Sequence, residues 1–409
     1  MKSNPDRQRP RNFDPNPFPY HTEISLLIES LSGLGAGVGR IDGWVVMVPF
    51  SLPGERIRAR IWRNHRNHSD ADLVEILTPS PDRVDPKCPL FGACGGCQYQ
   101  HLSYKAQLAW KKRQIGEQLS RLEGISAPIE DVTPSPKTYQ YRSKITPHFQ
   151  KPRDDKPLAI GFQRHDSRAI LDVPSCPIAT EAINAVMRKE REKIHETRYS
   201  FRKGGTLLLR DAAEGVVTDP NDVATEKVGN LIFQFQAGEF FQNNPFILPA
   251  MVEHVTTQAV AGGMRYMVDA YCGVGVFGLS ASAHFDEVTG IEIGAPAIRW
   301  ANANAVVNRI NNCRFLIGQA DEIFDSISYN ADKTAVVIDP PRKGCDRSFI
   351  VQLLAFKPKR IVYVSCHPAS QARDVGTLAS DRYEISIVQP FDLFPQTRHT
   401  ECVSTLARV

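Results

Sequence analysis

The stretch Tyr-Met-Val-Asp-Ala-Tyr-Cys-Gly-Val-Gly-Val-Phe-Gly, residues 266–278, decides the fold. Residues 266–270 are apolar except for Asp269, as in a buried strand, and the three glycines that follow allow a tight turn into a helix. Their spacing matches the dinucleotide-type pattern Gly-x-Gly-x-x-Gly, and Glu292 stands at a distance suited to binding ribose hydroxyls. A strand–helix turn without a ligand is the alternative interpretation.

Four more hydrophobic runs follow, and each leads into polar or thiol side chains. The runs are residues 287–291, 314–317, 335–338 and 361–364, followed by Glu292, Asp321, Asp339 and Ser365-Cys366. Their alternation with helical stretches such as 296–308 predicts a doubly wound α/β sheet. Ligands of such sheets bind beyond the carboxyl ends of the strands, so we expect these groups to face one crevice.

The acids at the strand ends favour S-adenosylmethionine over a dinucleotide as the ligand. Asp269, Glu292, Asp321 and Asp339 suit a sulfonium cation with an amino group and ribose hydroxyls, whereas they would repel a pyrophosphate. The glycine turn also lacks a nearby basic residue for a pyrophosphate. The glycine pattern by itself leaves an NAD-dependent oxidoreductase open.

Two residues near the C-terminus are candidates for covalent chemistry. Cys366 follows the apolar run 361–364, where a thiolate beside the cofactor can attack an electrophilic carbon. An inert buried cysteine is the alternative. Glu401 enters the apolar stretch 403–406 and is a candidate general base, with an exposed loop acid as the alternative. His399 is a candidate for positioning Glu401 or for a purely structural role.

Length and composition predict a cytoplasmic protein of two or three domains without membrane attachment, and we expect a monomer. The chain has 409 residues, 42% of them apolar, and a net charge of +4. It contains no apolar run of about 18 residues, which a membrane span requires, and residues 1–19 read as a disordered tail rather than a signal peptide. Nine cysteines in such a chain indicate metal binding or catalysis rather than disulfides.

Short strand-like runs punctuated by glycines predict a small β-barrel over residues 20–80. The expected strands cover residues 24–28, 44–48, 57–62 and 73–76. Arginines cluster between residues 56 and 68, together with Trp62. Such a cluster is typical of a nucleic-acid-binding surface, and a solvated strand face is the alternative.

Cysteines also cluster in the mixed region over residues 81–235. Cys88, Cys94 and Cys97 lie close together, and Cys176 is the best candidate for a fourth thiolate. An iron–sulfur cluster with four thiolates and a zinc site both fit this set.

Taken together, these motifs resemble the RNA uracil-C5 methyltransferase family, which forms 5-methyluridine in ribosomal and transfer RNA. The resemblance extends from about residue 20 to the C-terminus. It implies an N-terminal TRAM domain with an OB-like β-barrel, a mixed α+β central domain over 81–235 that carries a 4Fe–4S cluster, and a class I, Rossmann-like α/β methyltransferase domain over 236–409.

The resemblance also implies roles for single residues. Cys366 matches the nucleophile and Glu401 the base. The implied ligands of S-adenosylmethionine are Gln242 (in Phe241-Gln242-Asn243), Tyr271, Glu292 and Asp339, and those of the cluster are Cys88, Cys94, Cys97 and Cys176. Val276 stands where many members have asparagine, so that residue's hydrogen bond to the cofactor is not carried over.

The implied reaction is methyl transfer from S-adenosylmethionine to C5 of a uridine, through a covalent adduct of Cys366 with C6 of the base. The target uridine must leave its stack, which is easiest in a single-stranded loop. We expect 23S ribosomal RNA as the substrate. A transfer-RNA uridine-C5 methyltransferase and an inactive RNA-binding protein are the alternatives.

Overall fold

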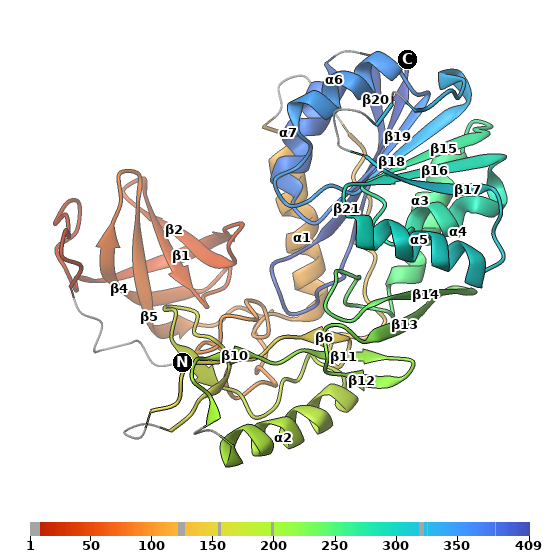
Figure 1. Ribbon diagram of the computed structural model, residues 1–409. Helices are drawn as coiled ribbons and strands as arrows, with labels where there is room; N and C mark the ends of the chain where they lie inside the picture. The colour runs from red at the N-terminus through yellow and green to blue at the C-terminus, as the bar shows by residue number, and fades with distance from the viewer. Residues whose placement is uncertain are drawn as a thin grey trace. The chain divides into compact units, whose positions relative to one another are not determined.

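Two structural units make up the chain, which Figure 1 shows as a ribbon. The computed structural model describes residues 9–121, 127–153, 157–197, 200–318, 323–324, 326–380 and 382–409. The first unit comprises Met1–Trp110, Ala159–Val173 and Gln396–Arg398, and the second comprises Lys111–Leu158, Pro174–Pro395 and His399–Val409. The first eight residues of the expected tail, and Asp321, lie outside the described residues.

A closed barrel of five strands forms the N-terminal part of the first unit, as the sequence predicts. Side chains of β4 alternate across the barrel wall, because Ile57, Ala59 and Ile61 are fully buried while the arginines between them point outward. The strand order is β1-β2-β3-β5-β4. The strands are β1 (Glu23–Leu31), β2 (Ala36–Ile41), β3 (Trp44–Pro49), β4 (Arg56–Asn64) and β5 (His68–Thr78).

Strand β2 is absent from the prediction, because its glycines indicate turns rather than a strand. A Cβ on Gly37 would lie 2.1 Å from Ser51 Oγ, and one on Gly39 would lie 2.4 Å from the Leu27 carbonyl oxygen. These glycines therefore allow a close approach of neighbouring backbone in a narrow barrel, which is a known use of glycine inside strands.

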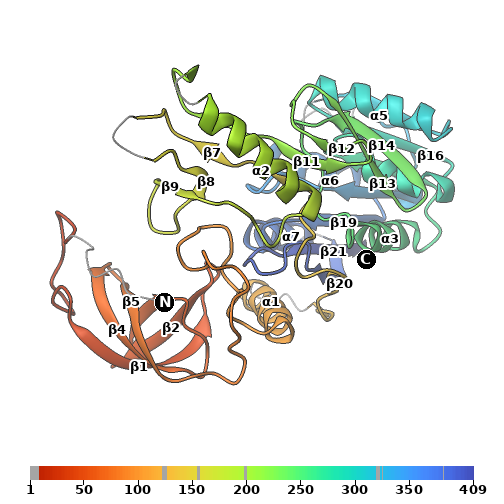
Figure 2. The same cartoon turned by 90° about the horizontal axis from the view of Figure 1, so that it is seen from below.

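Short elements complete the first unit and begin the second. In the first unit, β8 (Ile160–Gln163) and β9 (Ile170–Asp172) form a hairpin, and α1 (Tyr104–Leu119) begins there. In the second unit, α2 (Glu181–Glu196) packs on β11 and β12 (Figure 2). The other small strands are β6 (Lys144–Ile145), β7 (His148–Phe149), β10 (Gly205–Thr206), β11 (Leu209–Ala212), β12 (Gly215–Val217), β13 (Val223–Val228) and β14 (Leu231–Gln236).

A seven-stranded sheet with the order β17-β16-β15-β18-β19-β21-β20 dominates the second unit. The five strands from β17 to β19 in this order pair in parallel, and β21 is antiparallel to both its neighbours. The strands are β15 (Tyr266–Ala270), β16 (Glu287–Glu292), β17 (Cys313–Ile317), β18 (Thr334–Ile338), β19 (Arg360–Ser365), β20 (Tyr383–Phe391) and β21 (Glu401–Arg408). This sheet confirms the expected α/β architecture with mostly parallel strands.

Helices cover both faces of this sheet (Figure 1). One apolar core joins the sheet to α3, α4 and α5, and a second joins it to α6, α7 and the later part of α1. The helices are α3 (Leu248–Val260), α4 (Val276–Ala281), α5 (Ala295–Val307), α6 (Arg347–Phe356) and α7 (Pro368–Ala379), with short 3-10 turns at Ser282–His284 and Ala331–Lys333. Among the described helices, none has both the length and the apolar character needed to cross a membrane.

Candidate active site

Three neighbouring strand ends bring together expected cofactor ligands. Strand β15 lies between β16 and β18, and its last residue, Ala270, pairs with both. Tyr271, Glu292 and Asp339 stand one step further along these three strands. They therefore line the carboxyl edge of the parallel sheet, where ligands of such sheets bind.

The glycine turn after β15 has one open position and one closed position. Gly273 has φ +53°, and a Cβ placed on it would meet no atom within 4 Å. Gly275 has φ +87°, and a Cβ there would lie 3.0 Å from the ring of Phe315. Asp269 fixes the far end of the turn, because its Oδ2 accepts a 2.7 Å hydrogen bond from the Gly278 N–H. A ligand can thus approach the backbone at Gly273, whereas the turn itself requires Gly275.

Carboxyl groups accumulate at this edge. Glu292 Oε2 accepts a 3.3 Å hydrogen bond from the Gly273 N–H. Burial raises the pKa of Asp269 to about 7, and the charges of Asp339 and Glu292 add to the rise. The hydrogen bond from the Gly278 N–H acts in the opposite direction and lowers this pKa. Burial also raises the pKa of Asp339 to about 7, although part of its surface stays exposed. A cationic ligand would relieve this crowding of negative charge, and a pyrophosphate would increase it.

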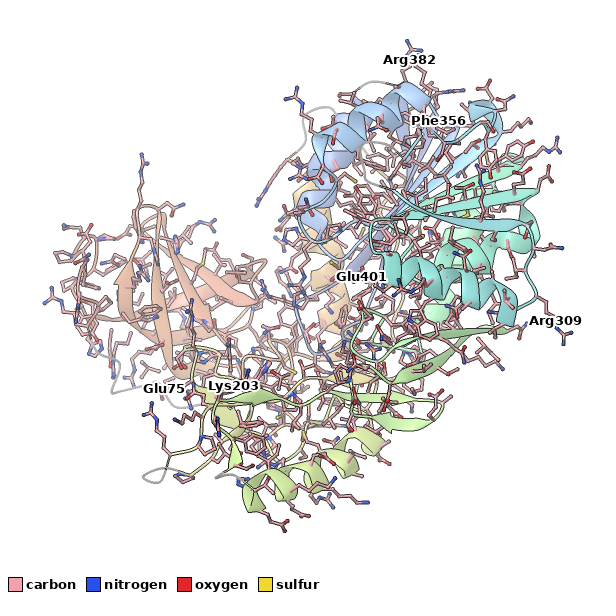
Figure 3. The ribbon with its side chains drawn as sticks, viewed as in Figure 1. Glu75, Lys203, Arg309, Phe356, Arg382 and Glu401 are labelled. Atoms are coloured by element: carbon pink, nitrogen blue, oxygen red, sulfur yellow. The ribbon has the colours of Figure 1, made fainter. Side chains whose placement is uncertain are left out.

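The pairing of β19 with β21 sets Cys366 opposite Glu401. Ser365 pairs with Cys402. Because the two strands are antiparallel, Cys366, which follows Ser365, faces Glu401, which precedes Cys402. Cys366 is half-buried and Glu401 is only 3% exposed. Figure 3 shows Glu401 inside the second unit, whereas Arg309 and Arg382 point outward at its periphery. The expected nucleophile and base are therefore neighbours.

Burial and like charges disfavour the ionised forms of both groups. Burial raises the pKa of Glu401 to about 8, with the Asp339 charge adding to the rise and Arg342 opposing it. Burial raises the pKa of Cys366 to about 11, and the charges of Glu401 and Asp339 contribute. The positive charge of Arg342 opposes this rise. Both shifts therefore favour the protonated forms of Glu401 and Cys366.

Side-chain donors from three distant places hold the segment that leads to Glu401. They are buried, and each binds a different residue of the segment 392–395. The contacts join Lys111 Nζ to Asp392 Oδ1 (2.6 Å), Tyr141 OH to the Pro395 carbonyl (2.9 Å) and Asn244 Nδ2 to the Leu393 carbonyl (3.0 Å). Since Asn244 stands two residues after Gln242, one of these contacts ties the expected cofactor segment to the base segment.

Gln242, His399 and Val276 lie in the same unit. Gln242 is half-buried in the loop between β14 and α3, directly after Phe241, whose ring stacks on that of Phe235 with centroids 4.3 Å apart. The His399 ring stands edge-on to a phenylalanine ring of the preceding loop. Val276 begins α4 and packs against the apolar core. Packing therefore accounts for the valine at this position.

The four cysteines of the expected cluster are half-buried and divided between the units. Cys88, Cys94 and Cys97 belong to the first unit, where Cys94 forms a β-bridge with Arg164. Cys176 belongs to the second unit, where the Asn184 side chain bonds its backbone N–H at 2.8 Å and its carbonyl at 3.0 Å. The local backbone of Cys94 and of Cys176 is thus fixed by hydrogen bonds within its own unit.

Two of the arginines of β4 are paired with acids on neighbouring strands. Arg58 lies 2.7 Å from Glu75, and Arg60 lies 2.8 Å from Glu23. Beyond these pairs, Arg63 and Arg66 are exposed near the end of the β4–β5 hairpin. Any phosphate-binding surface of the barrel is therefore expected at that end rather than along the whole strand.

Sequence patterns alone missed two residues of the site, Arg342 and Asn244. A signal existed for Arg342, because a cation directly after the strand-end motif Asp339-Pro340-Pro341 must lie near the ligand edge. Asn244 gave no signal, since its partner Leu393 is far away along the chain.

Comparison with known proteins identifies the family. The family model described as tRNA (Uracil-5-)-methyltransferase matches residues 217–409, and the TRAM-domain model of tRNA (uracil(54)-C(5))-methyltransferase matches residues 24–81. A tRNA (uracil(54)-C(5))-methyltransferase of Schizosaccharomyces pombe is 44% identical, with 96% of this chain and 80% of that protein covered. The Saccharomyces cerevisiae protein of the same name is 33% identical, with 95% and 74% covered.

A solved structure agrees with these sequence matches. The tRNA (uracil-54, C5)-methyltransferase of Pyrococcus abyssi, in complex with S-adenosyl-L-homocysteine, superposes with a TM-score of 0.72 at 25% identity. The match covers 94% of this chain and 100% of that one. The expectation of an RNA uracil-C5 methyltransferase that uses S-adenosylmethionine is thus confirmed at the level of the family. The chain belongs to the tRNA (uracil-5-)-methyltransferase family.

Proposed function

We propose that this chain methylates C5 of the uridine at position 54 of transfer RNA, with S-adenosylmethionine as the methyl donor. The observation that carries the proposal is the position of Cys366 opposite Glu401, beside the acidic strand ends. The choice of RNA rests on relatives named for uracil 54 of tRNA. It replaces the 23S ribosomal RNA expected from the sequence.

Cys366 acts as the nucleophile in this proposal. The thiol loses its proton to solvent, the resulting thiolate adds to C6 of uracil, and the electrons of the C5–C6 double bond move toward C5 and O4. C5, now electron-rich, takes the electrophilic methyl group that S-adenosylmethionine supplies. Glu401 then removes the C5 proton, the double bond re-forms, and the thiolate leaves C6.

The acids of the site would determine when Glu401 loses its proton and becomes a base. With a pKa of about 8, Glu401 is mostly protonated at neutral pH in the free site. A sulfonium cation near Asp339 and Glu292 lowers the pKa of neighbouring carboxyl groups by direct attraction. Cofactor binding would therefore help convert Glu401 into its basic form before the C5 proton has to leave.

Gln242, Tyr271, Glu292 and Asp339 are proposed to hold S-adenosylmethionine. Two observations support a fit to this ligand. The open backbone position at Gly273 leaves room for close approach, and the buried Asp269 Oδ1 lacks a hydrogen-bond partner among the described residues. The acidic edge also matches a ligand that carries positive charge.

Cys88, Cys94, Cys97 and Cys176 are proposed to hold a 4Fe–4S cluster with a structural role. Ligands of one zinc ion must crowd around a single centre, whereas cluster thiolates bind four different irons. The preference for a cluster over one zinc ion rests on the match of these four cysteines to the cluster ligands of the family that the sequence resembles. One zinc per chain and no acid-labile sulfide in anaerobically purified protein would contradict the proposed cluster.

The RNA substrate is tested by methylation in vitro. The purified protein is incubated with labelled S-adenosylmethionine and an unmodified tRNA transcript, and 5-methyluridine is mapped by mass spectrometry. We expect label at position 54 and none in a matched transcript with cytidine there. Label in fragments of 23S ribosomal RNA, with the tRNA left unmodified, would restore the earlier expectation.

The cytoplasmic location and the monomeric state stay predictions. Cell fractionation tests the location, and light scattering on the purified protein tests the oligomeric state.

A further inference from the structure

Two imidazoles and a carboxylate meet at the end of the β4–β5 hairpin of the barrel. Asp70 Oδ2 lies 2.8 Å from His65 Nε2, and Asp70 Oδ1 lies 3.8 Å from His68 Nε2. The two imidazole rings are stacked, with their centroids 4.3 Å apart. One ligand atom from each of the three side chains lies within 4.8 Å of the other two. The two oxygens of one carboxylate thus approach two different rings, which is more than a single ion pair requires.

The hairpin itself places these side chains together on the outer face of the barrel. Ser69 is fully buried, and because side chains alternate along a strand, His68 and Asp70 on either side of it both point outward. The His65 N–H donates a 2.8 Å hydrogen bond to the His68 carbonyl, which closes the turn and brings the third side chain beside the other two.

Buried hydrogen bonds hold the same piece of backbone from inside the barrel. Ser69 Oγ donates to Asn64 Oδ1 at 2.6 Å and accepts from Trp44 Nε1 at 2.9 Å. Asn64 Nδ2 in turn donates to the carbonyl oxygens of Asp14 and Phe18, at 2.7 Å each. The backbone that carries the two imidazoles and the carboxylate is therefore fixed independently of any ligand.

Asn67 orients one of the two rings. His68 Nδ1 lies 2.8 Å from Asn67 Oδ1, and since an amide oxygen only accepts, we assign the ring proton to Nδ1. The lone pair of a neutral His68 is then on Nε2, the nitrogen that approaches Asp70. Histidines that bind metals commonly donate their other ring N–H to an oxygen in this way, which fixes the tautomer and the direction of the ring.

We propose that His65, His68 and Asp70 bind one zinc ion, or another divalent transition-metal ion of the same class, with water as the fourth ligand. Two imidazole nitrogens and one carboxylate oxygen are a known set of protein ligands for zinc. The ligand atoms of a tetrahedral zinc ion are roughly 3.4 Å apart, so shifts of about 1 Å would complete the site. Side chains that are 31%, 23% and 25% exposed have room for such shifts. The ion takes the place of the proton between His65 and Asp70, which passes to solvent.

Protection of the histidines from diethyl pyrocarbonate tests the proposal. The reagent modifies unprotonated imidazoles, and peptide mass spectrometry measures the extent at each histidine separately. We expect Zn²⁺ to slow modification of His65 and His68, and Mg²⁺, which prefers oxygen ligands, to have no such effect. His195, exposed on α2, is the internal reference whose rate should not change. Because the readout is specific to each histidine, zinc bound by cysteines elsewhere does not affect it.

Variants of the hairpin show whether the protection comes from this site. Asp70→Asn keeps the shape of the side chain and removes the charged ligand, so half-protection should need more than about tenfold more zinc. Asn67→Ala should need about tenfold more, the usual effect of losing a group that orients a ligand. In His68→Gln, zinc should no longer protect His65.

Asp72→Asn is the matched control, because Asp72 lies on the same strand two residues beyond Asp70. Its histidines should be protected as in the wild type. Circular dichroism of each variant without zinc confirms that the barrel is folded before protection is compared. A wild-type protein whose His65 and His68 react equally fast with and without zinc overturns the proposal. Equal protection by magnesium overturns it too, as does an equal loss of protection in Asp70→Asn and Asp72→Asn.

Discussion

Charged side chains on the barrel differ in arrangement from those at the methyltransferase site. On the barrel, Arg58 and Arg60 are at least partly exposed and pair with acids across the strands. At the site, Asp269 and Glu401 are buried near other acids, and their pKa values lie far above the usual range. Exposed ion pairs contribute little to stability. Buried carboxyl groups close to one another, in contrast, are stable only when a proton or a nearby cation neutralises their charge. This difference is why we expect the second region, and not the barrel strands, to carry the chemistry.

The largest expected effect comes from removing the two reactive groups. Cys366→Ala should abolish methylation and form no covalent RNA complex, because no thiolate is left to add to C6. Glu401→Gln should still form the adduct and transfer the methyl group, but the C5 proton stays and the thiolate cannot leave. A denaturing gel should then show a shifted protein–RNA band that carries one labelled methyl group.

Two outcomes would contradict these roles. A fully active Glu401→Gln enzyme would exclude Glu401 as the base. Loss of activity without any adduct would mean that Glu401 acts before the methyl transfer or only positions the uridine.

Breaking a buried ion pair should have the next largest effect, this time on stability. Lys111 and Asp392 are both fully buried and 2.6 Å apart. Lys111→Met leaves the Asp392 charge without its partner, and such losses cost about 3–5 kcal/mol. Urea unfolding followed by circular dichroism measures the change. A loss of unfolding free energy below about 1 kcal/mol is typical of an exposed ion pair. Such a result would mean that the buried pair contributes no more to stability than the exposed pairs of the barrel.

The acids at the strand ends should matter next, through cofactor affinity. Glu292→Ala should weaken binding of S-adenosylmethionine by about 1.5–3 kcal/mol, the value of a hydrogen bond to a charged group. Isothermal titration calorimetry measures this, with Glu287→Ala, an exposed acid at the opposite end of the same strand, as the control. Equal affinities of the Glu292→Ala and wild-type proteins would take Glu292 out of the site.

The three buried acids should together make the stability of the protein depend on pH. Asp269, Asp339 and Glu401 have pKa values raised by burial to about 7, 7 and 8. A carboxyl group with a raised pKa in the folded state contributes stability below its unfolded pKa, and that contribution is lost as the pH rises through the folded value. The melting temperature should therefore fall from about pH 4, near the unfolded pKa of these acids, to about pH 8, the highest of their folded values. Scanning calorimetry with S-adenosylmethionine present should show a smaller fall.

The smallest effect is expected on the barrel. Arg58→Gln removes one exposed pair with Glu75 and should change the free energy of unfolding by about 0–1 kcal/mol. Arg63→Gln should be equally mild for stability but should weaken tRNA binding and reduce its salt dependence. Filter binding at two salt concentrations distinguishes the two arginines. A larger loss of RNA affinity in Arg58→Gln would mean that the paired arginines also reach phosphates.

The parallel strands could be predicted from the sequence because a strand buried on both faces reads as a continuous apolar run. Residues 266–270 and 335–338 are such runs, and the groups after them meet at one edge as expected. Strand β2 escaped prediction because its glycines serve close backbone contact. The pairings of the barrel arginines also escaped, since cross-strand partners depend on register.

The position of Glu401 opposite Cys366 depends on where β21 enters the sheet, and the local sequence does not indicate that place. The last strand enters between β19 and β20 in antiparallel direction, and only tertiary packing selects that place. The pair Lys111–Asp392 and the contact of Asn244 with Leu393 likewise join parts that are distant along the chain. Pattern analysis finds such residues only when a motif marks them.

Strand register in β21 therefore encodes part of the chemistry. If β21 slid by one residue in one direction, Cys402 would stand opposite Cys366, and two neighbouring thiols can be oxidised to a disulfide. A slide in the other direction would place Thr400 there, which cannot act as a base. A one-codon deletion that shifts this register would therefore separate the base from the nucleophile, and it would also turn the following side chains of β21 to the opposite face of the sheet.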